Sequence, residues 1–146
     1  MKKRLSTLLF FLLVSFIVLF GCSKEKKAIN RIHAYWHIKS YTVDGIDSLN
    51  LLTNSIGNTF HFYYQKYYAS EVFEISNLDL SSSNFGCYYF LGDDAKTIHI
   101  TDASGNKYTG PFRSGNAPVW EIIKLTNSEF SMKTTYNNKE YFIELQ

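Results

Sequence analysis

The chain has 146 residues and a formal net charge of +2, with 15 lysines and arginines against 13 aspartates and glutamates. A chain of this length suits one domain. Three of the positive charges lie in residues 2–4, and removing residues 1–21 leaves 12 basic and 13 acidic side chains, a net charge of −1. The basic character therefore belongs to the N-terminal segment, and we expect no nucleic-acid partner.

The first 21 residues have the layout of a secretory signal peptide. The basic residues 2–4 precede an apolar run from Leu5 to Phe20. This run is shorter than the roughly 20 apolar residues that a membrane-spanning helix needs. The alternative is an uncleaved signal anchor in which the cysteine after the run is incidental.

The segment Leu19-Phe20-Gly21-Cys22 ends this run and resembles the lipobox of bacterial lipoproteins, in which small residues lead into a cysteine. The resemblance implies cleavage before Cys22, attachment to its sulfur of one group that carries two fatty acyl chains such as palmitate, and a membrane anchor at the new N-terminus. Two acyl chains anchor stably where one does not, because each buried methylene contributes about 0.8 kcal/mol. Ser23 stands where many inner-membrane lipoproteins carry an aspartate retention signal. We therefore expect a lipid-anchored protein of the cell envelope, in the outer membrane.

After Cys22, the sequence predicts a tether and then one folded domain. Residues 22–30 begin with the charged stretch "SKEKK" after the cysteine, which has too little apolar content to pack, and residues 28–33 favour a short helical turn. We expect the folded domain to cover residues 31–146. Cys87 is then the one remaining cysteine, so no internal disulfide forms. Its apolar neighbours in "GCYYFL" favour a buried side chain over a reactive or dimer-forming thiol.

The domain is predicted to be all-β. Apolar and polar residues alternate in short runs separated by Gly, Asn, Asp and Ser, and no window keeps a 3.6-residue period. We expect an antiparallel up-and-down meander of about eight or nine strands, closed or nearly closed into a barrel, since closure removes exposed strand edges. An open sandwich is the alternative. A tight hairpin before the last run requires a positive φ, which Asn138 can adopt. The runs span residues 35–43, 59–64, 68–75, 87–91, 97–101, 108–112, 119–125, 130–135 and 140–145.

Both ends of this domain resemble bacterial lipocalin-like lipoproteins. The stretch "AYWHIKSYTVDGID" has a lone tryptophan early in the first strand and an Asp-Gly turn, and "VWEIIKLTNSEFSMKTTYNNKEYFIELQ" is similar to the ending of that group. The resemblance implies a small lipocalin-like barrel on a lipid tether and brings no catalytic residues with it. The matching positions of the second stretch are Trp120, Ile122, Leu125, Phe130, Met132, Tyr141, Ile143 and Leu145.

The sequence pattern contains no catalytic or metal-binding motif. The four histidines show no HxH or HExxH spacing, and metal ligands must converge on one point. Glu71 and Glu74 fall on opposite faces of one predicted strand, so they do not form the facing carboxylate pair of a glycosidase. We therefore expect neither an enzyme nor a cofactor.

Aromatic residues are the strongest feature of the domain, and the stretch "FHFYYQKYY" at 60–68 is the densest. One face of each strand is expected to fill the barrel, as structural core or as the lining of a ligand site. On the opposite face, Tyr63, Tyr67 and Tyr68 are the candidates for an exposed aromatic patch. The candidates for the interior are Trp36, Ile38, Phe60, Phe62, Phe73, Trp120, Ile122 and Met132.

We expect the first of two functions for such a barrel, and the second is the alternative. In the first, the protein is a binding module that holds a small apolar or amphipathic ligand inside the barrel. In the second, the barrel is filled, and the protein is a non-catalytic accessory or interaction subunit, or an inhibitor, of a cell-envelope complex. Large side chains in the interior favour the filled barrel. Ser40, Thr42 and Thr134 on the inside would favour a hollow barrel that hydrogen-bonds a ligand.

Overall fold

The computed structural model describes residues 24–66, 71–77, 86–92, 95–104, 110–112 and 118–146. For residues 55–56, 65–66, 71–77 and 102–104 the description is limited to the backbone. The predicted signal peptide and three of the predicted site residues, Cys22, Tyr67 and Tyr68, lie outside the described residues.

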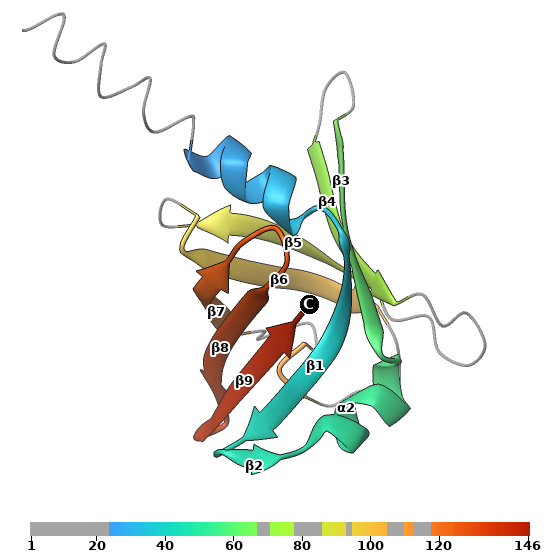
Figure 1. Cartoon of the computed structure of the whole chain (residues 1–146), viewed down its shortest axis with the longest axis vertical. Coiled ribbons are helices and arrows are strands. Elements are labelled where there is room, and N and C mark those ends of the chain that lie inside the picture. The colour runs from blue at the N-terminus through green and yellow to red at the C-terminus, as the bar shows by residue number, and fades with distance from the viewer. Residues whose placement is uncertain (1–23, 67–70, 78–85, 93–94, 105–109, 113–117) are drawn as a thin grey trace, which may run out of the picture.

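Within these residues, nine strands form one antiparallel sheet in which each long strand lies beside the next long strand of the chain. A helix at residues 24–32 precedes β1 (Tyr35–Val43), and the short β2 (Ile46–Asp47) and helix α2 (Leu49–Ile56) follow it. The predicted all-β antiparallel meander is therefore confirmed (Figure 1). The other strands are β3 (Thr59–Lys66), β4 (Glu71–Asn77), β5 (Gly86–Gly92), β6 (Thr97–Ser104), β7 (Val119–Leu125), β8 (Phe130–Tyr136) and β9 (Lys139–Leu145).

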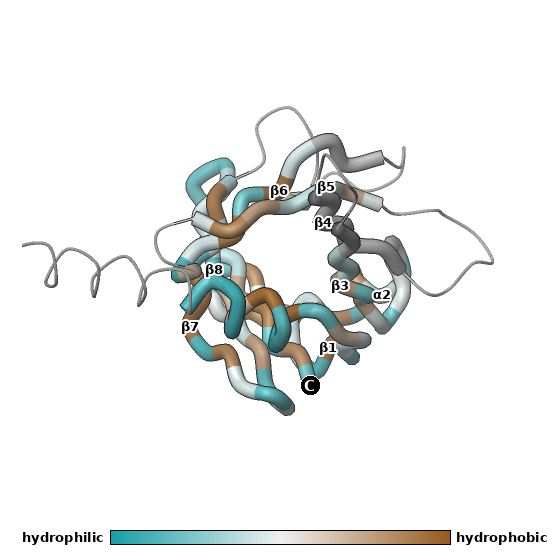
Figure 2. Tube along the Cα trace, turned by 90° about the horizontal axis from the view of Figure 1, so that it is seen from above, coloured by the Kyte–Doolittle hydropathy of each residue, from teal (hydrophilic) through white to brown (hydrophobic). Residues whose placement is uncertain are grey.

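The sheet curls into a barrel because its first long strand, β1, pairs both with β3 and with the last strand, β9. The start of β1 pairs with β3, where Trp36 lies opposite Phe60, and the rest of β1 pairs with β9, where Tyr41 lies opposite Ile143. The strand pairings thus run from β1 through β3 to β9 and back to β1, and the view from above shows the strands arranged as a ring (Figure 2). This arrangement leaves little unpaired strand edge.

Two of the three register shifts in the described strands change which side chains of β1 and β7 enter the barrel. In β1, the register shifts between Ile38 and Ser40, and Tyr41 becomes the next buried residue. In β7, the register shifts between Ile122 and Lys124, and the later residue Leu125 packs against the core. A bulge adds one residue to one strand, so all side chains after it change face. The bulge in β7 explains why Ile122 follows Trp120 by two residues but Leu125 follows Ile122 by three.

Large side chains from the described strands pack together inside the barrel, and many of them are aromatic. The ring centroids of Phe62 and Phe130 are 5.4 Å apart in an edge-on contact, and those of Phe112 and Trp120 are 4.7 Å apart in a stack. Such aromatic pairs contribute about 0.5–1.5 kcal/mol beyond the burial of their area. The largest fully buried side chains are Trp36, Trp120, Phe60, Phe62, Phe112, Phe130, Ile32, Leu52, Ile98 and Met132.

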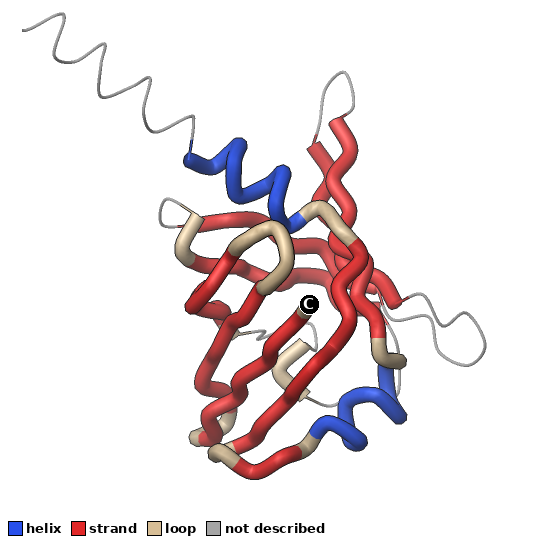
Figure 3. The backbone as a smooth tube through the Cα atoms, viewed as in Figure 1, coloured by secondary structure: helices blue, strands red, loops and turns tan. Residues whose placement is uncertain are grey.

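Two helices lie at opposite ends of the barrel, where the sequence predicted a tether and a loop (Figure 3). Helix 24–32 buries Ala28 and Ile32 on one face, since residues four apart share a helix face. The folded part therefore begins before residue 31, and the helix is longer than the predicted turn at 28–33. At the other end, α2 buries Leu52 in the core. Both helices escape a search for helical periodicity because each is short and buries few side chains.

The predicted strand at residues 108–112 is wrong in the part that the structure describes. Gly110, Pro111 and Phe112 form a bend and a turn, and Phe112 is fully buried in the core. Pro111 lacks a backbone N–H, and so it fits poorly into a sheet interior. The apolar pattern of this segment therefore reflects the buried side chain of Phe112, which packs a turn against the core, and does not indicate a strand.

Two tight turns use residues with positive φ. Asn137 (φ 51°) and Asn138 (φ 60°) connect β8 to β9, which confirms the prediction for Asn138, and Asp44 (φ 52°) and Gly45 (φ 76°) connect β1 to β2. Asn, Asp and Gly tolerate this backbone region best. Asp44 also binds β9: its Oδ1 accepts a hydrogen bond from the N–H of Glu140 (2.8 Å), and its own N–H donates to the carbonyl of Glu140 (2.8 Å). This turn therefore fastens β1 to β9.

Trp36 joins helix 24–32 to the barrel. Its side chain is 2% exposed, and its indole N–H donates a hydrogen bond to the carbonyl of Ile32 (2.9 Å). A carbonyl in the last turn of a helix has no hydrogen-bond donor within the helix. The indole N–H of Trp36 therefore supplies the donor that the carbonyl of Ile32 would otherwise lack. The ring also contacts Phe130 edge-on, with centroids 5.6 Å apart.

We expect Trp36→Ala to lower the free energy of unfolding by about 3–5 kcal/mol, because truncating a buried tryptophan leaves a large cavity. Trp36→Phe keeps much of the volume but leaves the carbonyl of Ile32 without its donor, so its cost should be about 1–3 kcal/mol. Urea denaturation measures both values. Stability close to wild type in Trp36→Ala would contradict the structural role.

Candidate functional site

Most of the predicted interior residues come together inside the barrel. Ile122 is partly buried and packs against this cluster. The backbone of Phe73 lies in β4 opposite Tyr64, while its side chain is outside the described part. The remaining six, each at most 5% exposed, are Trp36, Ile38, Phe60, Phe62, Trp120 and Met132.

The polar residues that would mark a hollow barrel do not line the interior as a group. Ser40 and Thr42 are half-buried, because the bulge in β1 gives the interior position to Tyr41. Thr134 is buried, but its hydroxyl donates a hydrogen bond to the carbonyl of Val119 (2.7 Å). That hydroxyl is engaged within the sheet, so among the described residues these three positions favour a filled barrel.

The two tryptophans differ in one polar atom. The indole N–H of Trp36 is satisfied by the carbonyl of Ile32, as described above. Trp120 is 0% exposed and stacks on Phe112, with the ring planes at 18°, and its indole N–H has no hydrogen-bond acceptor among the described residues. Buried donors nearly always have a partner. Trp120 is therefore the interior position where a bound acceptor atom would fit the chemistry of the site.

The predicted aromatic patch is described only at Tyr63. This side chain is half-buried, and its ring lies 5.8 Å from that of His33 and 5.6 Å from that of His61. Tyr63 is thus part of a cluster of rings beside the end of helix 24–32.

Other aromatic side chains are more exposed than Tyr63, and the sequence analysis missed them. Tyr35, Tyr88 and Phe90 are 61%, 49% and 47% exposed. The exposure of two of them could have been predicted from strand alternation, because Tyr88 and Phe90 alternate along β5 with the buried Cys87 and Tyr89.

A row of two apolar side chains with a histidine between them crosses the outer face of β5, β6 and β7. Phe90 lies opposite His99, and His99 lies opposite Val119 in the strand register. The rings of Phe90 and His99 stack with centroids 4.5 Å apart and planes at 11°. Phe90 and Val119 are each 47% exposed. We call these three residues the outer row.

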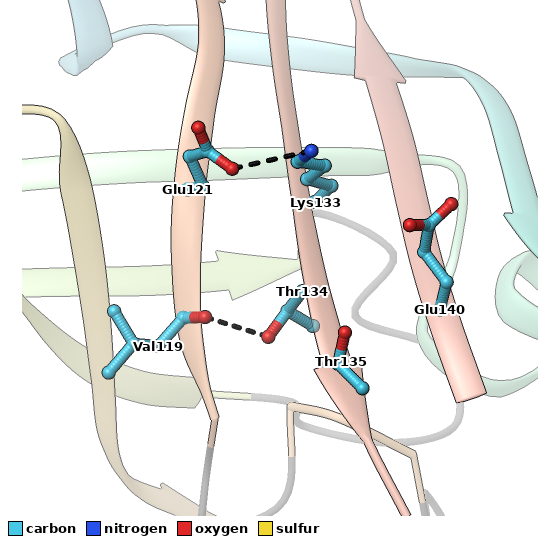
Figure 4. Close-up of a pocket in the computed structure, with 6 residues that line it drawn as sticks. All are labelled: Val119, Glu121, Lys133, Thr134, Thr135 and Glu140. Carbon is cyan, nitrogen blue, oxygen red and sulfur yellow. Dashed lines mark hydrogen bonds and ion pairs between the residues drawn. The ribbon is translucent and has the colours of Figure 1, made fainter. Parts of the chain in front are cut away.

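The outer row ends at a polar depression of about 300 Å³ on β7, β8 and β9 (Figure 4). Lys133 and Glu121 form an ion pair across it (3.4 Å). Small-molecule sites are mostly enclosed and apolar, whereas this depression has solvated charged walls and therefore suits a polar partner surface. Its lining residues are Val119, Glu121, Lys133, Thr134, Thr135 and Glu140.

The described residues contain no group of three His, Cys, Asp or Glu side chains that could hold a metal ion. Cys87 is 1% exposed and lies in the core, in the position expected for a small apolar side chain. Within the described part of the chain, no helix has the length and apolar content needed to cross a membrane. No protein family, curated protein or solved structure matches this chain.

We expect Trp120→Phe to change the free energy of unfolding by less than about 1 kcal/mol, because the loss of volume is offset by removing a buried N–H without a partner, which costs about 1–3 kcal/mol. Trp36→Phe is the matched control, since there the same change breaks a hydrogen bond. Urea denaturation of both variants gives the comparison. A greater loss in Trp120→Phe than in Trp36→Phe would show that the Trp120 N–H has a partner in the folded protein.

Tyr89 makes stability depend on alkaline pH. Burial raises the pKa of its hydroxyl well above the ordinary value of 10.0, because the phenolate would lose its hydration. In the unfolded chain the hydroxyl ionises near pH 10, so above that pH the unfolded state loses a proton that the folded state keeps. The contribution of Tyr89 is therefore complete below about pH 10 and declines as the pH rises further.

We expect the thermal unfolding midpoint to fall as the pH is raised above about 10, and to fall less in Tyr89→Phe. Tyr88→Phe is the matched control, because the adjacent Tyr88 is exposed. Thermal melts over a pH series measure both slopes. Equal slopes in Tyr89→Phe and wild type would refute the assignment to Tyr89.

Proposed function

We propose that this protein is a lipid-anchored, non-catalytic accessory subunit of a bacterial cell-envelope complex, with a filled lipocalin-like barrel that acts through its outer surface. The observation that supports the proposal most strongly is the packing of large side chains in the described part of the interior, where Phe60, Phe62 and Trp120 are each 0% exposed. A barrel of eight strands is just wide enough for side chains or for one small ligand. Among the described residues, large side chains occupy that space.

The proposed anchor is a diacylated Cys22 in the outer membrane, as the lipobox resemblance implies. Helix 24–32 begins two residues after this cysteine. At about 3.5 Å for each extended residue, the folded part would begin within about 7 Å of the lipid attachment. The proposed subunit would therefore sit directly at the membrane surface.

The proposed contact surface is the outer row with its adjoining depression. Aromatic residues are enriched at protein interfaces, and Phe90 offers an exposed ring that is already held in place by stacking on His99. The ion pair of Glu121 and Lys133 supplies a polar border beside Val119. An apolar strip with a polar border is the usual layout of a protein interface.

A second candidate function is the binding of a small ligand inside the barrel, and one observation favours it. The indole N–H of Trp120 is buried without an acceptor among the described residues. A small apolar molecule with a carbonyl or carboxyl oxygen would supply that acceptor. This candidate requires the side chains around Trp120 to make room.

Native mass spectrometry of the protein, extracted in mild detergent from its own host, tests both candidates. We expect the mass of residues 22–146 plus acyl chains, in a complex with an envelope protein and without a small ligand. A retained small molecule that disappears in Trp120→Phe would instead establish the second candidate. A mass that includes residues 1–21 would contradict the lipid anchor.

The surface variant Phe90→Ser gives the matching test of the contact surface. It should reduce the complex seen by native mass spectrometry at least tenfold, since a central aromatic contact contributes about 2 kcal/mol or more. Tyr35→Ser is the control, because Tyr35 is also an exposed aromatic residue but lies outside the outer row. Equal loss in both variants would argue against the outer row as the interface.

A further inference from the structure

Helix 24–32 has a cationic outward face. Ala28 and Ile32 face the barrel, and successive residues are about 100° apart around a helix. This spacing directs Lys26, Lys27 and Asn30 to the opposite side, and all three are exposed. Arg31, in contrast, reaches back to the barrel, where its guanidinium donates to the carbonyl of Leu125 (3.4 Å). The outward face thus consists of two lysines with an asparagine between them.

These lysines lie in the first turn of the helix, where a positive charge does not stabilise the helix. The first turn carries the positive end of the helix dipole, so acidic residues stabilise it and basic residues oppose it. Residues 24–27 nevertheless contain three lysines and one glutamate. A departure from local helix preference commonly marks a position that serves function.

Charge is divided unevenly between this helix and the rest of the mature chain. Residues 24–31 contain four basic side chains and one acidic side chain, a net charge of +3. The remaining residues to 146 contain 8 basic and 12 acidic side chains, a net charge of −4. An anionic surface would attract the helix and repel the barrel, so it would favour one orientation of the molecule.

We propose that the outward face of helix 24–32 lies on anionic phospholipid headgroups and fixes the orientation of the barrel above the membrane. The proposal rests on the acylated Cys22 of the proposed function, which brings the first turn within reach of the headgroups. A basic segment next to a lipid anchor gains attraction from anionic lipids within a Debye length of the surface. Contact with those headgroups also compensates the unfavourable position of the lysines in the first turn.

The experiment places an environment-sensitive dye on the outward face through Asn30→Cys, with the acylated protein reconstituted in vesicles. Cys87 is buried, and Cys22 is occupied by its acyl chains, so the dye reports on residue 30. We expect a blue shift of its emission in vesicles of phosphatidylglycerol and phosphatidylcholine, and no shift in phosphatidylcholine alone. At about 1 M salt the shift should disappear, because the screening length falls to about 3 Å.

The charge-reversal variant Lys26→Glu/Lys27→Glu should lose the shift on anionic vesicles. This variant also improves the first turn of the helix, so loss of the shift cannot result from loss of the helix, and an unchanged melting temperature verifies that. Lys96→Glu/Lys139→Glu is the matched control, with the same change of charge at exposed positions on the barrel, and it should keep the shift.

Two outcomes would overturn the proposal in distinguishable ways. If the protein is acylated and the dye responds equally to anionic and neutral vesicles, the lipid anchor stands, but the proposed contact between helix 24–32 and anionic headgroups is refuted. An intact mass without acyl chains on Cys22 would refute the anchor, and the orientation model would fall with it.

Discussion

The pairing of β1 with β9 is the constraint on which the rest of the structure depends. At one end of this seam, His37 and Gln146 exchange both backbone hydrogen bonds (2.8 and 2.9 Å), and at the other end Asp44 holds the backbone of Glu140. Once first and last strands pair, the number of strands fixes the width of the barrel. The interior then has to be filled by whatever side chains the strand registers turn inward. Aromatic packing, helix placement and the character of the outer surface all follow from this closure.

Strand periodicity was sufficient to predict β1 and β7 with their observed limits, because exposed residues alternate with more buried ones over the first four residues of each strand. It could not predict the bulges that bring in Tyr41 and Leu125, since an extra residue within a strand leaves no mark on composition. The full length of helix 24–32, of which only a turn at residues 28–33 was predicted, and the whole of α2 were missed for a related reason. Each contributes one fully buried side chain, Ile32 and Leu52, and one such residue does not define a period.

The candidate interior could be predicted as a set of residues but not as a set of interactions. Parity identified Trp36 and Trp120 alike, yet only the folded chain shows that one indole N–H reaches the carbonyl of Ile32 and that the other lacks an acceptor among the described residues. Hydrogen-bond partners depend on distances between segments that are far apart in sequence. The outer row has the same origin, because Phe90, His99 and Val119 meet only through the registers of three strands.

The bulges also determine where the length of this chain can change during evolution. Ile123 is the extra residue of the bulge in β7, and Lys39 occupies the same place in β1. Deleting either one would restore simple alternation and leave Trp120, Ile122 and Leu125, or Trp36, Ile38 and Tyr41, on their present face. Deleting Ser40 or Lys124, the other residue of each bulge, would have the same effect, whereas deleting His37 or Glu121 would turn part of the core outward. Sequences that share this barrel are therefore expected to differ by one residue at these two bulges and to keep their spacing elsewhere in the two strands.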